Sequence, residues 1–256
     1  ATRSKQEKGL SLVLISLLLS GCSSLEVPKT FQYQEIDTTF FRLASWQKIT
    51  DPNKPVRIYI EGDGYAFNAH GRASSNPTPK EKDFRKLAFG DPHDNVVYLA
   101  RPCQFISGIR CHRMYWSTGR FSNEVIVAMG EALEMISNKQ KVTLIGYSGG
   151  AQVAGLCAVT NKNINVQKII TIAGNLDHQA WCRHHNVPLL SDSMDLTKYW
   201  LKFSEINQIH FLCENDDVIP PKLTLTRLGN DLRAILLSDA THANGWLKYA
   251  DLIYKQ

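Results

Sequence analysis

The sequence predicts an α/β fold: a doubly wound, mostly parallel β-sheet with helices on both faces. Short apolar runs rich in Val, Ile and Leu alternate with segments whose apolar residues recur at helical spacing. Most of these runs are continuously apolar rather than alternating, which is typical of parallel strands buried on both faces. The 256 residues, 43% of them hydrophobic, suffice for one substantial core. We therefore expect one folded domain after the N-terminal leader.

The first expected elements are edge strands, a buried strand and a helix. Residues 31–49 have alternating apolar positions, as edge strands do, and the run VRIYIEG at residues 56–62 is apolar and rich in β-formers. The following segment, TPKEKDFRKLAFG, has Thr78 as a candidate N-cap, Pro79 at the first helical position and a glycine at its end. These signals predict a helix over residues 79–89.

The middle of the chain alternates strands with helices. NVVYLA at residues 95–100 predicts a short buried strand. Residues 122–137 have helical spacing, with one apolar face made by Val125, Met129, Leu133 and Ile136. KVTLIG at residues 141–146 predicts a strand, and the small residues at 149–159 predict a helix directly after it. KIITIAG at residues 168–174 predicts the next strand.

The last part of the chain continues the same alternation. Its expected elements are strands at residues 208–213 and 234–237 and helices at residues 221–229 and 244–254. Two long interruptions without strong periodicity fall at residues 101–121 and 175–205. Insertions of that length in a compact domain are usually binding loops or lids.

The five residues from Gly146 to Gly150, GYSGG, place Ser148 on a turn between a strand and a helix. Gly146 and Gly150 permit the close approach of strand and helix that such an elbow needs, while the serine holds a strained backbone at its tip. Unpaired N–H groups at the helix N-terminus point at whatever binds beside the hydroxyl. A serine hydroxyl is a poor nucleophile until a base takes its proton, so a histidine and a carboxylate are expected downstream.

Both partners occur in the order Ser, Asp, His. Asp216 follows the strand at 208–213, and His242 lies in the loop between the strand at 234–237 and the last helix. Asp217 is the alternative acid. The expected catalytic set is therefore Ser148, Asp216 and His242.

With these residues in place, the chain resembles the α/β-hydrolase superfamily over about residues 50–256. Asp216 and the Ile219-Pro220 pair resemble the D-x-x-V-P turn that carries the acid in that fold. More narrowly, the chain is similar to bacterial lipoprotein-type hydrolases through the motifs YIEGDG, YLARPCQ, YW, GYSGG and AGNLD. The resemblance implies hydrolysis of a carboxylic ester, thioester or amide in a small acyl-containing substrate, through an acyl-enzyme on Ser148 and without a cofactor.

The resemblance also suggests an oxyanion hole. In this superfamily one donor is the N–H of the residue after the nucleophile, here Gly149. The second comes from the loop after the third strand, here Glu61-Gly62-Asp63-Gly64. Relatives often have a His-Gly pair there, so Glu61 is a departure that leaves the donor open between Asp63, which we favour, and Gly64.

The first 22 residues resemble a lipoprotein signal peptide. Basic residues precede the apolar run LSLVLISLLL, which is too short for a stable membrane anchor and ends in LSGC at Cys22. The resemblance implies export and an acylated Cys22, with palmitate among the expected acyl groups. Ser23 favours the periplasm-facing outer membrane of a Gram-negative cell. Residues 23–49 would then be a linker with early strands, and residues 50–256 the catalytic domain.

Export would place the remaining cysteines in an oxidising compartment. Cys103 and Cys111 lie in one loop-like stretch and are expected to form a disulfide. Cys157 and Cys213 fall on apolar patterns typical of buried thiols. Because five cysteines remain after Cys22, at least one of Cys157, Cys182 and Cys213 should be free.

Composition excludes some classes of function. The net charge of +5 is mild and its charges are interspersed, so no nucleic-acid partner is expected. His178, Cys182, His184 and His185 match no common zinc spacing, so no metal is expected. Two other hypotheses stay open: an acyltransferase using the same three residues, and a non-catalytic binding lipoprotein of the same fold.

Overall fold

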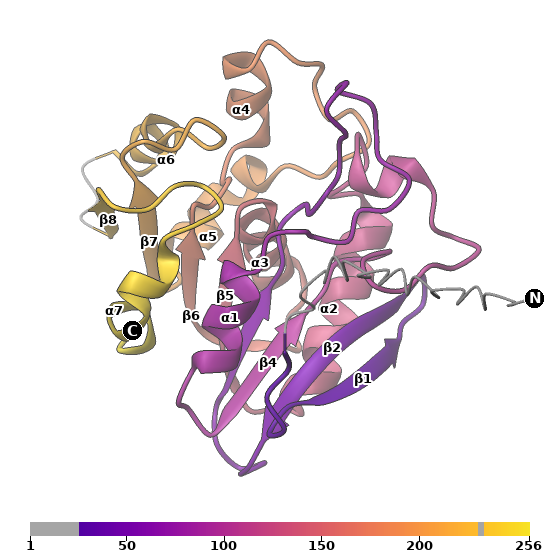
Figure 1. Cartoon of the computed structure of the whole chain (residues 1–256), viewed down its shortest axis with the longest axis vertical. Coiled ribbons are helices and arrows are strands. Elements are labelled where there is room, and N and C mark those ends of the chain that lie inside the picture. Colours follow the sequence, from indigo (N-terminus) through magenta and orange to yellow (C-terminus); the bar gives the residue numbers. More distant parts are fainter. Residues whose placement is uncertain (1–25, 230–232) are drawn as a thin grey trace, which may run out of the picture.

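The computed structural model describes residues 26–229 and 233–256. The signal peptide and Cys22 predicted from the sequence lie outside these residues. Eight strands form one sheet with the order β1-β2-β4-β3-β5-β6-β7-β8 (Figure 1). The strands are β1 (Gln32–Asp37), β2 (Arg42–Ile49), β3 (Val56–Ile60), β4 (Asn95–Leu99), β5 (Lys141–Tyr147), β6 (Asn165–Ile172), β7 (Gln208–Cys213) and β8 (Ala234–Leu237).

Among the described strands, the antiparallel pairs are the two that involve β2. β1 pairs with β2 and β2 with β4 in antiparallel fashion, whereas the strands from β4 across to β8 pair in parallel. The predicted doubly wound, mostly parallel sheet is therefore confirmed. In such a sheet the carboxyl ends of the parallel strands meet at one edge, where ligands usually bind.

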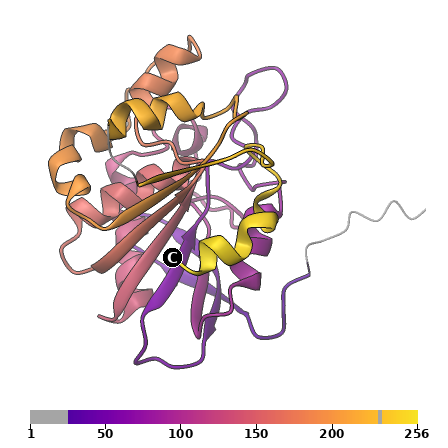
Figure 2. The ribbon, with the colours of Figure 1, turned by 90° about the vertical axis from the view of Figure 1, so that its left-hand side faces the viewer.

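Helices cover both faces of the sheet, as predicted. They are α1 (Asp83–Gly90), α2 (Asn123–Ser137), α3 (Gly149–Thr160), α4 (His178–His184), α5 (Trp200–Ser204), α6 (Pro221–Leu228) and α7 (Ala250–Tyr254). One core joins α2, α3 and α5 to one face of the sheet. The other core joins α1 and α7 to the opposite face (Figure 2). In β3, Ile58 belongs to the first core and Tyr59 to the second, which explains why the strand is continuously apolar.

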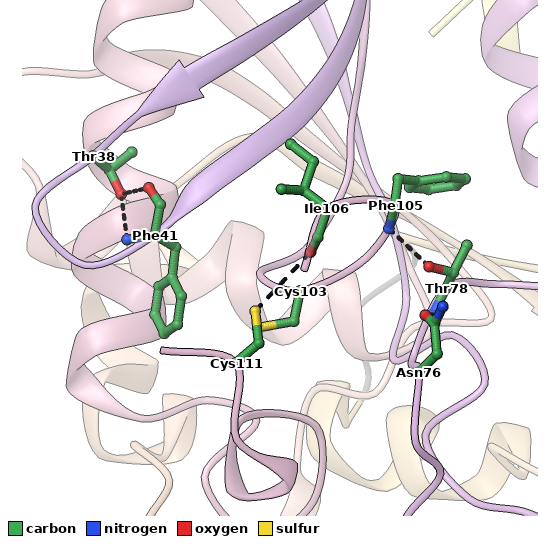
Figure 3. The surroundings of a disulfide bond; sticks show 8 residues. All are labelled: Thr38, Phe41, Asn76, Thr78, Cys103, Phe105, Ile106 and Cys111. Carbon is green, nitrogen blue, oxygen red and sulfur yellow. Dashed lines mark hydrogen bonds between the residues drawn. A yellow bond between two sulfur atoms is a disulfide. The ribbon is translucent and has the colours of Figure 1, made fainter. Parts of the chain in front are cut away.

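The predicted start of the helix at 79–89 is wrong. α1 begins only at Asp83, and the residue before it makes no side-chain capping bond. The hydroxyl of Thr78 instead accepts the N–H of Phe105 (2.7 Å), and the Thr78 N–H donates to the side chain of Asn76 (Figure 3). The residue expected to cap the helix therefore joins two loops, and the chain stays non-helical until Asp83.

The two predicted interruptions contain short elements. Residues 175–205 include α4, a 3₁₀ turn at Leu196–Tyr199 and α5, and residues 101–121 include a 3₁₀ turn at Arg113–Trp116. The predicted last helix is divided into a 3₁₀ turn at Trp246–Tyr249 and α7. Across the described ranges, 26–229 and 233–256, every helix is too short or too polar to cross a membrane.

Candidate active site

Ser148 lies on a sharp turn between β5 and α3. β5 is an inner strand with β3 and β6 as neighbours, so its carboxyl end opens near the middle of the sheet edge (Figure 1). Ser148 has a φ of +51°, a region that non-glycine residues rarely occupy. Its N–H donates to the carbonyl oxygen of Ile172, and its carbonyl oxygen accepts the N–H of Asn175. Bonds to the chain that follows β6 thus hold the strained turn.

The glycines around Ser148 are required by close approach of the backbone. A Cβ added at Gly146 would lie 2.6 Å from the Cα of Ala151, and one at Gly150 would lie 2.3 Å from the carbonyl oxygen of Ile60. Both distances are far shorter than the van der Waals contact distance of a Cβ with a carbon or oxygen atom. The pattern G-x-S-x-G therefore has a steric basis here, because only glycine lets α3 start against β3 and β5.

The structure brings Ser148, His242 and Asp216 into one hydrogen-bonded chain. The imidazole Nε2 of His242 lies 3.0 Å from the Oγ of Ser148, and its Nδ1 lies 2.8 Å from an oxygen of Asp216. Ser148 follows β5, Asp216 follows β7 and His242 follows β8, so three parallel strands deliver the three side chains to the same edge. Distances of this size permit proton transfer between serine and imidazole.

Asp216 is held as a buried acceptor. Its second carboxylate oxygen accepts the N–H groups of Val218 (2.9 Å) and Ile219 (2.8 Å), and its side chain is 1% exposed. Asp217, the alternative acid, is exposed. Of the two carboxylates, only Asp216 is within hydrogen-bond distance of His242.

The loop that carries His242 is anchored from both sides. The carbonyl oxygen of His242 accepts hydrogen bonds from the hydroxyl of Tyr147 and from the indole N–H of Trp246, each at 3.0 Å. Tyr147 also lies beside the imidazole ring, with 5.3 Å between ring centroids. Tyr147, the residue before Ser148, therefore positions His242.

The loop after β3 lies against the elbow and carries the expected oxyanion donors. A Cβ at Gly149 would lie 2.1 Å from the Asp63 carboxylate, which shows how closely the two backbones approach. Within the described part of the chain, the N–H groups of Gly149, Asp63 and Gly64 donate no hydrogen bond to a loop backbone or side chain. All three are thus free to donate to a ligand.

Glu61, which replaces the histidine of the expected His-Gly pair, has a structural role. Its carboxylate accepts the N–H of Gly62 (2.8 Å) and the hydroxyl of Tyr98 (2.5 Å). Burial raises the pKa of the Glu61 carboxyl, and these two hydrogen bonds act against that rise. Because the Gly62 N–H is used internally, it is not available as a donor, and Asp63 and Gly64 stay the two expected candidates.

A loop closed by a disulfide contacts the chain segment after β3. Cys103 and Cys111 are joined by a disulfide (Figure 3). Gln104, next to Cys103, donates to the carbonyl oxygen of Gly62 (2.9 Å) and accepts the N–H of Arg101 (2.9 Å). The loop closed by the disulfide is therefore connected directly to the backbone of the expected oxyanion hole.

Two buried arginines hold the side chain of Asp63. Arg120 donates to one carboxylate oxygen at 2.7 Å and Arg101 to the other at 3.4 Å. Burial alone would raise the pKa of the Asp63 carboxyl, but Arg120 and Arg101 outweigh that effect and hold the pKa below its usual value. Neither arginine was assigned a role from the sequence, although Arg101 lies within the motif YLARPCQ.

A cleft of about 390 Å³ opens at Ser148. Ser148 and His242 lie in it together with Asp63 and Gly64. Its aromatic and apolar lining comes from Ala66, Phe67, Pro79, Phe84, Tyr147, Trp181, Val218 and Ala243. Charged residues complete the wall: Glu61, Glu81 and Arg120. Such a cleft is large enough for a small ester.

The other described cysteines and histidines form no metal-binding group. Cys157, Cys182 and Cys213 are buried free thiols, and burial raises the pKa of the Cys157 thiol to about 12. Considering only residues 26–229 and 233–256, no three of the His, Cys, Asp and Glu side chains are grouped so as to hold a metal ion. His178 is buried on α4 and contacts the carbonyl oxygen of Met194.

Solved structures share this architecture at low sequence identity. An esterase of Pyrococcus furiosus matches with a TM-score of 0.58 and 14% identity, over 88% of this chain and 90% of the esterase. An α/β serine hydrolase without a lid from Xanthomonas campestris matches with a TM-score of 0.52 and 13% identity, over 89% and 92% of the two chains. An α/β serine hydrolase homologue of Coxiella burnetii matches with a TM-score of 0.54 and 14% identity, over 88% and 94%.

These similarities show that the chain has the α/β-hydrolase fold. No protein-family model matches the sequence, and no curated protein matches it significantly.

Proposed function

We propose that this chain is a serine hydrolase that cleaves a carboxylic ester through an acyl-enzyme on Ser148. The observation that carries the proposal is the hydrogen-bonded chain from Ser148 through His242 to Asp216 at the end of a cleft. The α/β-hydrolase fold and the esterase and serine hydrolases that share it are consistent with this chemistry. Because fold alone does not determine function, the geometry of the site is the stronger support.

In the proposed first step, His242 Nε2 takes the hydroxyl proton as Ser148 Oγ attacks the ester carbonyl carbon. Asp216 holds the imidazole in the required tautomer and stabilises the imidazolium that forms. The negative charge that develops on the carbonyl oxygen is received by the N–H of Gly149 and by that of Asp63, with Gly64 as the alternative. Each such donor is worth about 3 kcal/mol to the transition state.

The second half of the reaction uses the same groups in reverse. His242 gives its proton to the departing alcohol, which leaves the acyl group on Ser148. Water then enters the cleft, His242 takes one of its protons, and the hydroxide attacks the acyl carbon. The collapsing intermediate releases the carboxylic acid, and the proton returns to Ser148.

We further propose that the enzyme is exported and held at a membrane by lipid on Cys22. The support is the sequence alone: a short apolar run ends in Leu19-Ser20-Gly21-Cys22. One acyl chain gives only marginal binding, but several chains on one cysteine anchor a protein stably. The site would then face the periplasm.

Covalent labelling with a fluorophosphonate tests the hydrolase proposal. We expect one adduct per chain, mapped by mass spectrometry to Ser148, and its loss in His242→Ala. Ser75→Ala provides a control, because Ser75 is exposed and distant in sequence from the elbow. Failure of the folded wild-type protein to react, or an adduct on another serine, would count against the proposal and favour the non-catalytic alternative.

A panel of aryl esters with graded acyl lengths then defines the substrate. The soluble domain lacking residues 1–22 is the appropriate sample for these assays.

A further inference from the structure

The cluster of Asp63, Arg101 and Arg120 holds one more positive charge than negative charge. The side chains of Arg101 and Arg120 are only 5% and 6% exposed, and both bind the single carboxylate of Asp63. Asp63 interacts electrostatically with these two arginines. A buried charge without a counter-charge is costly, and among the described residues Asp63 is the one ion-pair partner of both arginines, so the second arginine needs a further partner.

Of the two arginines, Arg120 is the one that reaches the cleft. Arg120 lines the cleft with Ser148, whereas Arg101 does not. Arg101 lies behind it, donates to the carbonyl oxygen of Arg120 and lies 5.4 Å from the ring centroid of Phe121. The excess charge is therefore presented to the substrate through Arg120.

The guanidinium of Arg120 is held rigidly with part of its donor set unused. Its Nε donates to the carbonyl oxygen of Ser117 (2.8 Å) and its Nη1 to Asp63. Its Nη2 has no hydrogen-bond acceptor among the residues that the structure describes. The rings of Phe67 and Trp181 lie near it, at 5.3 and 5.8 Å from the guanidinium carbon. A fixed guanidinium with a spare donor is a typical receptor for a carboxylate or phosphate.

Besides Asp63, two acidic residues line the cleft, Glu61 and Glu81, and among the described residues neither forms an ion pair with Arg120. Glu61 interacts electrostatically with Arg85 and Glu81, and its carboxylate is already hydrogen-bonded. Phe84 and Tyr147 stack on each other next to these acids, with 5.1 Å between their ring centroids. Glu61 and Glu81 thus lie near Tyr147, whereas the acid next to Arg120 is Asp63, whose carboxylate Arg101 shares.

We propose that the natural substrate carries an anionic oxygen group, such as a carboxylate, that binds Arg120 while its ester carbonyl lies at Ser148. This inference rests on the proposed hydrolase function and adds a substrate class to it. Arg120 is a substrate-binding residue in this account, with no part in the bond-making steps. The remainder of the substrate contacts the apolar and aromatic wall and carries no negative charge.

Two matched pairs of esters test the proposal. The first pair carries the charge on the acyl group: the p-nitrophenyl monoester of glutaric acid and its analogue with a terminal carboxamide. The second pair carries it on the leaving group: para-acetoxybenzoate and para-acetoxybenzamide. For one of the pairs we expect kcat/KM to be roughly 10- to 100-fold higher for the anionic ester, after subtraction of spontaneous hydrolysis.

Variants assign that preference to one side chain. In Arg120→Gln, kcat/KM should become the same for the anionic and the neutral ester of a pair, whatever happens to the absolute rates. Arg113→Gln is the control, because Arg113 is an exposed arginine that does not line the cleft, and it should keep the ratio. A wild-type ratio of one or less in both pairs would overturn the proposal even if neither variant folds, and so would an unchanged ratio in Arg120→Gln.

Binding separates this proposal from the hydrolase proposal. We expect Ser148→Ala to bind the anionic ester of one of the two pairs more tightly than its neutral analogue in calorimetry, again by roughly 10- to 100-fold, even if no ester is turned over. Absence of that difference in both pairs would contradict the anion site. A binding preference without wild-type turnover would retain the anion site and reject the hydrolase.

Discussion

At the residue scale, two adjacent aspartates have opposite environments. Asp216 is buried and contacts His242, whereas its neighbour Asp217 is exposed. We expect Asp216→Asn to lower kcat by about 10⁴-fold, on the precedent of a trypsin-like triad, because the amide stabilises the wrong imidazole tautomer. Asp217→Asn should leave kcat unchanged. Steady-state kinetics of both variants decide the assignment. The reverse pattern would identify Asp217 as the carboxylate that acts with His242.

Single residues also show what the sequence could predict. Ser148, Asp216 and His242 were identifiable because each follows a recognisable strand, and parallel strands bring such positions to one edge. Arg120 was not identifiable, because it lies in a segment without periodicity and binds Asp63, 57 positions away. Only the folded chain shows that two arginines share one carboxylate.

At the element scale, the disulfide loop supports the oxyanion loop through Gln104. Removing the disulfide in a Cys103→Ser/Cys111→Ser variant should lower the free energy of unfolding by about 2–3 kcal/mol in the chain-entropy model. It should also lower kcat, because Gln104 then holds Gly62 less firmly. Chemical denaturation and ester kinetics measure the two effects.

Ser107→Ala is a suitable control, since Ser107 is exposed in the same loop. If the double variant matched wild type in both stability and kcat, the supporting role of the disulfide would be refuted.

Elements whose signals are local were predicted better than those that depend on distant contacts. The helix at 122–137 has its own apolar face, and the structure places α2 at nearly the same residues. α1 starts later than expected because Thr78 binds Phe105 from a distant loop. The short helix α4 is capped by Asp177, whose side chain accepts the N–H of Ala180. Such seven-residue helices are too short to show periodicity in a sequence.

At the scale of the whole molecule, the predicted fold class follows from the alternation of apolar runs and helices, and the structure confirms it. The shape of the cleft was not predictable, because its walls come from loops far apart in the sequence. Phe67, Trp181 and Val218 line it from three different connections. Their positions depend on tertiary packing that no local pattern describes.

The proposed lipid anchor also belongs to this scale. We expect Cys22→Ala to abolish acylation and to move the protein from the membrane fraction to the soluble fraction of the cell, since the anchor depends on that one side chain. Cys182→Ala is a control, because Cys182 is a buried free thiol. Unchanged processing and unchanged membrane fractionation in Cys22→Ala would contradict the anchor.

The central claim is that Ser148 performs the chemistry, and ester turnover by the folded Ser148→Ala variant tests it most directly. Circular dichroism and thermal unfolding should first show that the variant folds as wild type does. We predict that its kcat falls by roughly 10⁶-fold, as in other enzymes whose three residues act as a unit, with a residual rate that comes from substrate binding and the oxyanion hole. The kcat of His242→Ala should fall as far, and the kcat of the Ser148→Ala/His242→Ala double variant should fall little further. Turnover by Ser148→Ala at a rate close to that of wild type would contradict the account.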